Sequence, residues 1–241
     1  MLWYKAWRES RVPFLLIALF MAGLCIYPVS GQKVFRASVP ISYTAYVYIV
    51  VFGKLGNGFL YFPPSLLGMG GLLRERGRGT AALSLSLPVS RLRQVGVRAA
   101  LGLIEIAALA LVPAILILTL SPIVGESYPI SLALHFALLW IVCGSAIFAM
   151  AFLLSAVLPG EYTALLVSFI AIRLLESVTN MSSLQPFSLF RIEGGMKWPL
   201  PGLRMITGLP EPFPWATLFV IAIVAFALIA MATRITQRED F

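Results

Sequence analysis

The sequence has little charge and few of the residues that build catalytic or metal centres. Charged residues make up 12% of the 241 residues and hydrophobic residues 60%, whereas a soluble domain averages about 25% charged and about 45–50% apolar residues. The apolar excess must face lipid, which excludes a soluble globular domain. The lone histidine, His135, and the two cysteines, Cys25 and Cys143, cannot form a Cys/His metal cluster. Both cysteines fall in apolar runs and are expected to be buried thiols.

The sequence also lacks a nucleotide-binding loop and a catalytic cluster. No G-x-x-x-x-G-K-[ST] segment occurs, so the chain does not bind ATP in the P-loop manner and no cofactor is expected in it. His135 and Ser145 would lie about 15 Å apart on one helix, too far for a base and its nucleophile. The net charge of +8 does not predict nucleic-acid binding, because the basic residues sit at the ends of apolar runs. There they set topology and contact anionic lipids.

Long apolar runs predict an all-α, polytopic membrane protein with a single transmembrane domain over 1–241. A crossing helix needs about 17–25 residues. The predicted spans are 12–28, 55–73, 97–120, 130–158, 162–178 and 215–233. Pro63 and Pro64 should kink the second span.

The tyrosine-rich segment 41–52 is either the start of a very long second span or an interfacial segment. Three glycines, Lys54 and Asn57 interrupt the sequence around its end, which favours the interfacial version.

The opening stretch, "MLWYKAWRESR", is typical of an amphipathic helix lying in the membrane interface. Helical spacing puts Leu2, Trp3, Ala6 and Trp7 on one face and Lys5, Arg8 and Glu9 on the other. We expect Trp3, Trp7 and Arg8 to anchor it at the interface. A signal peptide is the alternative, but the tryptophans and Glu9 are unusual in its basic region, and "YPVSG" is a poor cleavage site.

The polar block 72–98, "LLRERGRGTAALSLSLPVSRLRQVGVR", separates two apolar runs and is dense in arginine. Six spans place both termini on one side of the membrane, and the block 72–98 falls on the same side. That side holds the basic residues of this block and of the two terminal segments. The positive-inside rule makes that side cytosolic. Leu and Ser alternate in "AALSLSL", which favours a strand, but a lone strand has no partner and a short surface helix is preferred. Ser90 can cap the next helix, in whose first turn Arg91 and Arg93 oppose the helix dipole.

The segment "RERGRGTAALSLSLPVSR" resembles the cytosolic loop of bacterial ABC-2 type permeases, in which E-R-x-x-G-T leads to L-P-V-S-R. The amphipathic opening, the six spans and the tail "QRED" are similar to the same family, whereas Arg78 between the two glycines departs from its pattern. The resemblance implies a coupling helix at 80–87 in the groove of a separate ATPase subunit, which binds the ATP. The residues implied to contact that subunit are Glu75, Arg76, Gly79, Thr80, Leu83, Leu85, Leu87, Pro88 and Arg91.

The resemblance further implies an exporter permease in a bacterial inner membrane. Its partners would be a nucleotide-binding ATPase subunit, a second permease copy or homologue, and membrane lipids. Tyr61, Phe62, Ser65 and Glu105 are candidates for a path that suits a lipid, an amphipathic antibiotic or a peptide. Each also has a structural explanation, since the same apolar surface could be a dimer interface.

Three charged residues inside the spans bear on the alternatives. Glu105 is a functional candidate by its position inside a span, or a structural contact to another helix. Arg173 and Glu176 share a helix face and are expected to pair with each other, with a substrate contact as the alternative. A secondary transporter or channel, the alternative function, would need ionisable groups converging at mid-depth, and the sequence offers only Glu105 and Arg173.

Overall fold

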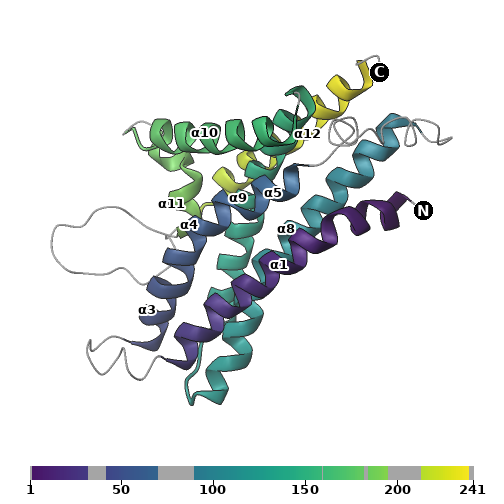
Figure 1. Ribbon diagram of the computed structural model, residues 1–241. Helices are drawn as coiled ribbons and strands as arrows, with labels where there is room; N and C mark the ends of the chain where they lie inside the picture. The colour runs from purple at the N-terminus through teal and green to yellow at the C-terminus, as the bar shows by residue number, and fades with distance from the viewer. Residues whose placement is uncertain are drawn as a thin grey trace.

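A computed structural model describes residues 2–31, 42–69, 90–158, 160–181, 184–194 and 213–238, and every element in these ranges is helical. Figure 1 shows the long helices packed side by side, with α10 crossing over them. The elements are α1 (Leu2–Ser30), α3 (Tyr43–Val47), the π-helix η1 (Tyr48–Gly53), α4 (Lys54–Tyr61), α5 (Pro63–Gly68), α8 (Arg91–Ile123), α9 (Ile130–Val157), α10 (Glu161–Thr179), the 3-10 turn η2 (Gln185–Phe187), α11 (Leu189–Gly194) and α12 (Trp215–Arg238).

Within the described ranges, five helices are long and apolar enough to cross a membrane: α1, α8, α9, α10 and α12. They confirm five of the predicted apolar runs and the all-α character of the described residues, and they make the chain a candidate polytopic membrane protein. Helix α8 begins at Arg91, before the apolar span 97–120, and the predicted Ser90 cap is confirmed, because the Ser90 hydroxyl accepts a hydrogen bond from the Arg93 N–H at 3.4 Å.

The opening stretch differs from the prediction. It is not a separate amphipathic helix but the first three turns of α1, which runs unbroken through Pro13 to Ser30. Glu9, expected on the water-facing side, instead pairs with Arg98 of α8, with 2.8 Å between Oε2 and Nη1. Pro13 lies in the fourth turn of α1, where a proline removes one backbone hydrogen bond and favours a kink, but the helix continues past it.

The preference for an interfacial 41–52 segment is wrong. Residues 43–53 lie in the core, where Tyr43, Tyr46, Val51 and Phe52 are buried. The Tyr46 hydroxyl donates to the Pro28 carbonyl at 2.7 Å. The aromatic residues thus supply apolar area and satisfied hydroxyls, a combination that suits burial.

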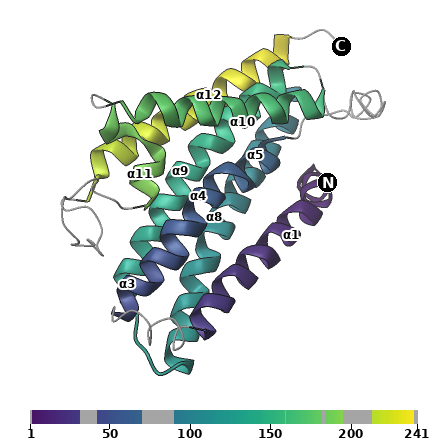
Figure 2. The ribbon, with the colours of Figure 1, turned by 60° about the vertical axis from the view of Figure 1, so that its left-hand side comes forward.

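The described part of the second predicted span, 55–73, forms the short helices α4 and α5, which continue the series begun by α3 and η1 (Figure 2). Residues 70–73 of that span lie outside the described residues. The series of helices is interrupted at Phe62, because Pro63 and Pro64 lack the N–H groups that a continuing helix would use. The predicted kink is thereby confirmed as a helix break.

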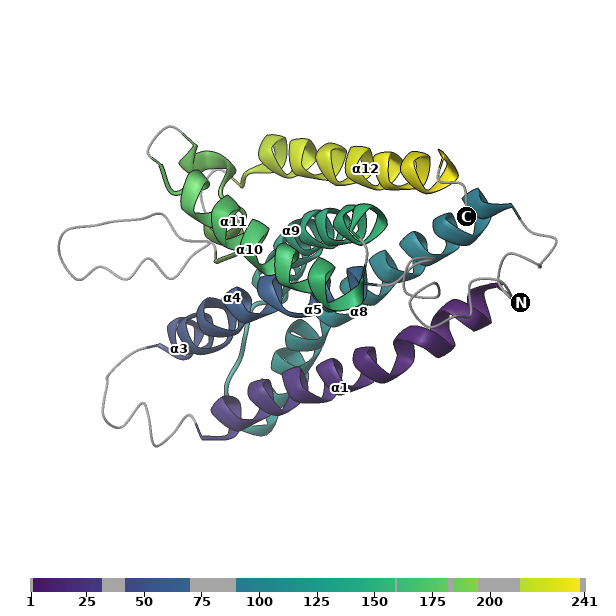
Figure 3. The same ribbon diagram turned by 45° about the horizontal axis from the view of Figure 1, so that its top comes forward.

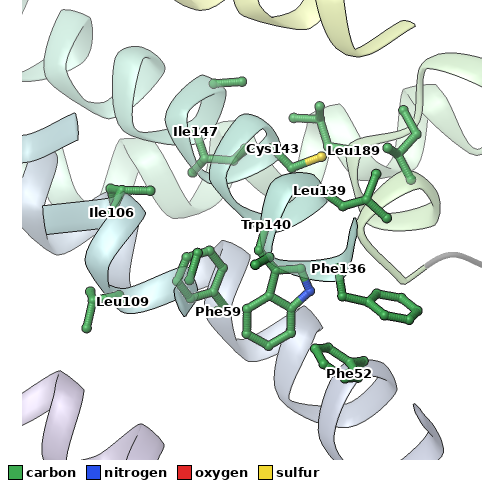
Figure 4. Close-up of a cluster of buried hydrophobic side chains, with 14 of the residues drawn as sticks. Phe52, Phe59, Ile106, Leu109, Phe136, Leu139, Trp140, Cys143, Ile147 and Leu189 are labelled. Atoms are coloured by element: carbon green, nitrogen blue, oxygen red, sulfur yellow. The ribbon is translucent and has the colours of Figure 1, made fainter. Parts of the chain in front are cut away.

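Helix α9 forms the centre of the bundle and packs against α12, α8, α5, α10, α11 and α4. Its middle carries Trp140, which stacks on Phe59 of α4 with 4.9 Å between ring centroids and meets Phe52 edge to face. Figure 4 shows these rings beside α9, with Ile106 and Leu109 of α8 completing the cluster.

Candidate functional site

The residues implied to contact an ATPase subunit, Glu75 to Pro88, lie outside the described residues. The structure places their neighbours: Met69 follows α5, and Arg91 begins α8. Figures 1 and 3 show the start of α8 at the same end of the bundle as both chain termini. The first turns of α1 and the last turns of α12 thus lie at the end of the bundle where α8 begins. The position of the arginine-rich residues before Ser90 stays a prediction.

The predicted interface anchors lie on the first turns of α1. Trp3 and Arg8 are exposed, whereas Trp7 is half-buried against Phe14, with ring centroids 5.6 Å apart. Trp3 and Arg8 are thus free to meet lipid headgroups, while Trp7 also packs within its own helix. Their anchoring role stays a prediction.

The three candidates for a substrate path on α4 and α5 do not share one surface. Phe62 is 59% exposed and contacts Phe169 of α10 edge to face, whereas Ser65 is fully buried. The Tyr61 ring lies beside Phe190 of α11, 5.2 Å between centroids. The structure therefore brings Tyr61 and Phe62 to the α10 and α11 side but separates Ser65 from them.

Tyr61 belongs to a polar cluster with two charged residues of α10. Its hydroxyl donates to Glu176 Oε2 and accepts from Arg173 Nη1 at 2.7 Å. Arg173 Nη1 also lies 2.8 Å from Glu176 Oε2, which confirms the predicted internal pair. The Tyr61 hydroxyl thus joins α4 to α10. The ion pair within α10 contributes little stability, because Arg173 is largely exposed.

Glu105 lies at the contact between α1 and α8, which we call the α1–α8 seam: Glu9 and Ser10 of α1 with Arg98 and Glu105 of α8. Glu105 is buried and accepts a hydrogen bond from the Ser10 hydroxyl. Closer to the start of α8, the Glu9–Arg98 ion pair joins the same two helices. Glu105 thus has a structural partner on a neighbouring helix, one of the two explanations that its sequence position left open.

The structure adds one acid that the sequence did not single out. Glu193 lies on α11, between the predicted spans 162–178 and 215–233, and its side chain is fully buried. The signal that could have found it is the apolar spacing of Leu189, Phe190 and Ile192, which indicates a short helix with a buried face. All three are buried.

Other candidates are accounted for by local contacts. Cys25 and Cys143 are free and buried, as predicted. The Ser145 hydroxyl donates to the Ile141 carbonyl at 2.6 Å, and His135 Nδ1 lies 2.6 Å from the backbone carbonyl oxygen of Ser131. Each therefore engages the preceding turn of α9 rather than the other. Among the described residues, no group of three or more His, Cys, Asp or Glu side chains is placed to hold a metal ion.

No protein-family model matches the chain, and no curated protein matches its sequence. In the part of the chain that the structure describes, the fold is all-α, and its five long apolar helices make the protein a candidate polytopic membrane protein by length and composition.

Proposed function

We propose that this chain is the membrane subunit of an ATP-driven exporter of the ABC-2 type. The observation that carries the proposal is the segment "RERGRGTAALSLSLPVSR", placed between apolar helices of a chain with no P-loop of its own. ATP would be bound and hydrolysed by a separate nucleotide-binding subunit. A sixth crossing, built from α3 to α5, would complete the membrane domain and place both termini in the cytosol.

The packing of α8 supports this proposal mechanically. Helix α8 has 33 residues and so is about 50 Å long, and it begins directly after the arginine-rich segment. The α1–α8 seam joins the N-terminal half of α8 to α1 through an ion pair at Arg98 and a part-buried hydrogen bond at Glu105. A displacement of the segment by a docked ATPase would therefore move α8 and α1 together.

The proposed assembly contains two permease chains, identical or related, and two ATPase subunits in a bacterial inner membrane. Its cargo would be hydrophobic or amphipathic, such as a lipid, an antibiotic or a peptide, because the helix faces are apolar. Exposed apolar side chains on α10, including Leu166, Ile170 and Leu174, give such a surface. They would meet lipid, cargo or the second permease. No nucleic acid takes part.

Substitutions in the segment test the proposal. Glu75→Ala, Arg76→Ala and Leu85→Ala should weaken binding of the ATPase subunit, since an interface anchor contributes about 2 kcal/mol or more, or about 30-fold in affinity. ATP hydrolysis by the reconstituted complex should become uncoupled from transport while the membrane domain stays folded. Arg234→Ala, which removes a cation from α12 outside the segment, is the matched control. Normal coupling in all three variants would refute the assignment.

A secondary transporter or channel is the second candidate, and Glu193 is the observation that favours it. A buried acid that makes no ion pair with any described residue is the kind of group that proton-driven transport uses. This candidate requires that the purified chain alone move cargo in response to a proton or sodium gradient. The first candidate requires that movement depend on ATP and on the partner subunit.

A further inference from the structure

Helix α11 carries a carboxyl group into the centre of the bundle. The helix has six residues, too few to cross a bilayer, and it packs against α9, α4 and η2. Glu193 is 0% exposed, and its flanking residue Ile192 is buried as well. Figure 4 shows Leu189 of the same helix next to Cys143 of α9. The short helix therefore brings an ionisable group into apolar surroundings.

Neither carboxyl oxygen of Glu193 has a hydrogen-bond partner among the residues that the structure describes, and the indole N–H of Trp140 is also buried without one. Both side chains border the same point on α4. A Cβ atom added at Gly56 would lie 3.0 Å from Glu193 Oε1 and 3.2 Å from Trp140 Cζ2. Gly56 thus allows α11 to approach closely. We use the name α11 pocket for this packing contact of Gly56, Trp140 and Glu193.

No cation among the described side chains balances a charge on Glu193. From α9, Cys143 is a free, buried thiol beside Leu189 of α11 (Figure 4), and His135 engages its own helix. From α4, the titratable side chain that the structure describes is Tyr61, which binds Glu176 and Arg173 instead. The turn η2 has no ionisable residue.

Two remaining charges near α11 also make no ion pair with Glu193. Arg191 lies on α11 itself and is half-buried. Arg173 lies on α10 and pairs with Glu176. An isolated carboxylate in such a place is strongly disfavoured relative to the neutral acid.

We propose that Glu193 is a proton-binding site, neutral when α11 is seated against α9 and α4, so that seating this helix takes up one proton from water. The proton resides on Oε1 or Oε2, and it must leave if α11 leaves the core and the carboxyl meets water. The inference does not depend on how transport is powered.

The sign of the pH dependence follows from burial, which raises the pKa of the Glu193 carboxyl well above its usual range. The folded state then holds a proton that the unfolded state has released. Stability is therefore greatest below the ordinary glutamate pKa of about 4.3 and falls as pH rises towards the raised value. Across that window, the unfolding midpoint should fall by about 3–5 °C per pH unit because of this one group.

The test compares thermal unfolding of the full-length wild-type protein and Glu193→Gln in detergent between about pH 5 and about pH 8. The glutamine side chain of this variant cannot ionise, so the variant should lose this part of the slope, whatever its absolute midpoint. Glu176→Gln, which removes a more exposed acid, is the control and should keep the wild-type slope. Equal slopes in wild type and Glu193→Gln would overturn the proposal.

An infrared difference spectrum at neutral pH gives an independent readout. The wild type minus Glu193→Gln should contain the carbonyl band of a protonated carboxylic acid, and wild type minus Glu176→Gln should not. A carboxylate band in place of the acid band would overturn the assignment. The proposal would also be overturned if sodium or potassium ions raised the thermal unfolding midpoint of the wild type at the higher pH but not that of Glu193→Gln. A metal cation, rather than a proton, would then be the ligand of Glu193.

Discussion

The α1–α8 seam and the α11 pocket each bury an acid, and they do so in opposite ways. Glu105 in the seam accepts a hydrogen bond from Ser10 and has the Glu9–Arg98 ion pair nearby. Glu193 in the pocket has no partner among the described residues. Burying a polar group costs free energy unless a partner compensates for the water it loses. The hydrogen bond from Ser10 therefore compensates for the burial of Glu105 in the α1–α8 seam. The α11 pocket, in contrast, stays assembled only while Glu193 holds a proton.

The largest effect is expected when the seam loses its hydroxyl. Ser10→Ala leaves the Glu105 carboxyl buried with no hydrogen bond from Ser10, so the seam comes to resemble the pocket. Leaving a buried polar group unsatisfied costs about 1–3 kcal/mol, which thermal unfolding in detergent measures directly.

A double variant separates this cost from other effects of Ser10→Ala. Ser10→Ala with Glu105→Leu removes both polar partners and should recover most of the lost stability, because replacing both with apolar groups can be nearly neutral. If the double variant is no more stable than Ser10→Ala alone, the hydrogen bond is not what holds the seam.

A smaller effect is expected from crowding the pocket. Gly56→Ala puts a methyl group against Glu193 Oε1 and Trp140 Cζ2, at the lower end of the ~1–3 kcal/mol typical of overpacking. Gly58→Ala on the same helix meets nothing within 4 Å. It should gain the ~0.5–1 kcal/mol by which alanine exceeds glycine inside a helix. Equal midpoints for the two variants would mean that α11 does not depend on the close approach at Gly56.

The smallest effect concerns the ion pair of the seam. Glu9→Gln removes one charge of a pair whose side chains are 32% and 18% exposed for Glu9 and Arg98. Partial screening by water limits the loss to about 1 kcal/mol or less. The difference between the variant and the wild type should shrink as salt is raised. A loss larger than that of Ser10→Ala would make the ion pair, rather than the buried hydrogen bond, the main joint.

The sequence predicted the parts of the fold that depend on continuous apolar character. Helices α9, α10 and α12 begin within one residue of the predicted spans at 130, 162 and 215, because Pro129, Gly160 and Pro214 precede them and interrupt the chain. Ser90 was predicted as a cap from its position before an apolar run, and the structure confirms it. Such signals are local and do not need the tertiary structure.

Prediction from the sequence failed where a glycine or a charged residue packs against another helix. Gly56 looks like a break in an apolar run, but it makes room for another helix, which no local pattern reveals. The stretch around Glu193 looks like a solvated loop because of its prolines, glycines and charges. Helix α11 in this stretch has six residues, too few for a helical periodicity of apolar residues to stand out. The burial of Glu193, the acid that we propose binds a proton, was therefore found only from the packing of α11. The coupling roles of Glu75 to Pro88 stay predictions.

The most direct measurement compares cargo movement by the purified chain alone with movement by the chain joined to an ATPase subunit, in sealed vesicles. We expect movement only with the ATPase subunit and ATP, and its loss on Arg76→Ala but not on Arg234→Ala. Movement by the chain alone, driven by a proton gradient and abolished by Glu193→Gln, would contradict an ATP-driven permease and establish a secondary transporter in its place.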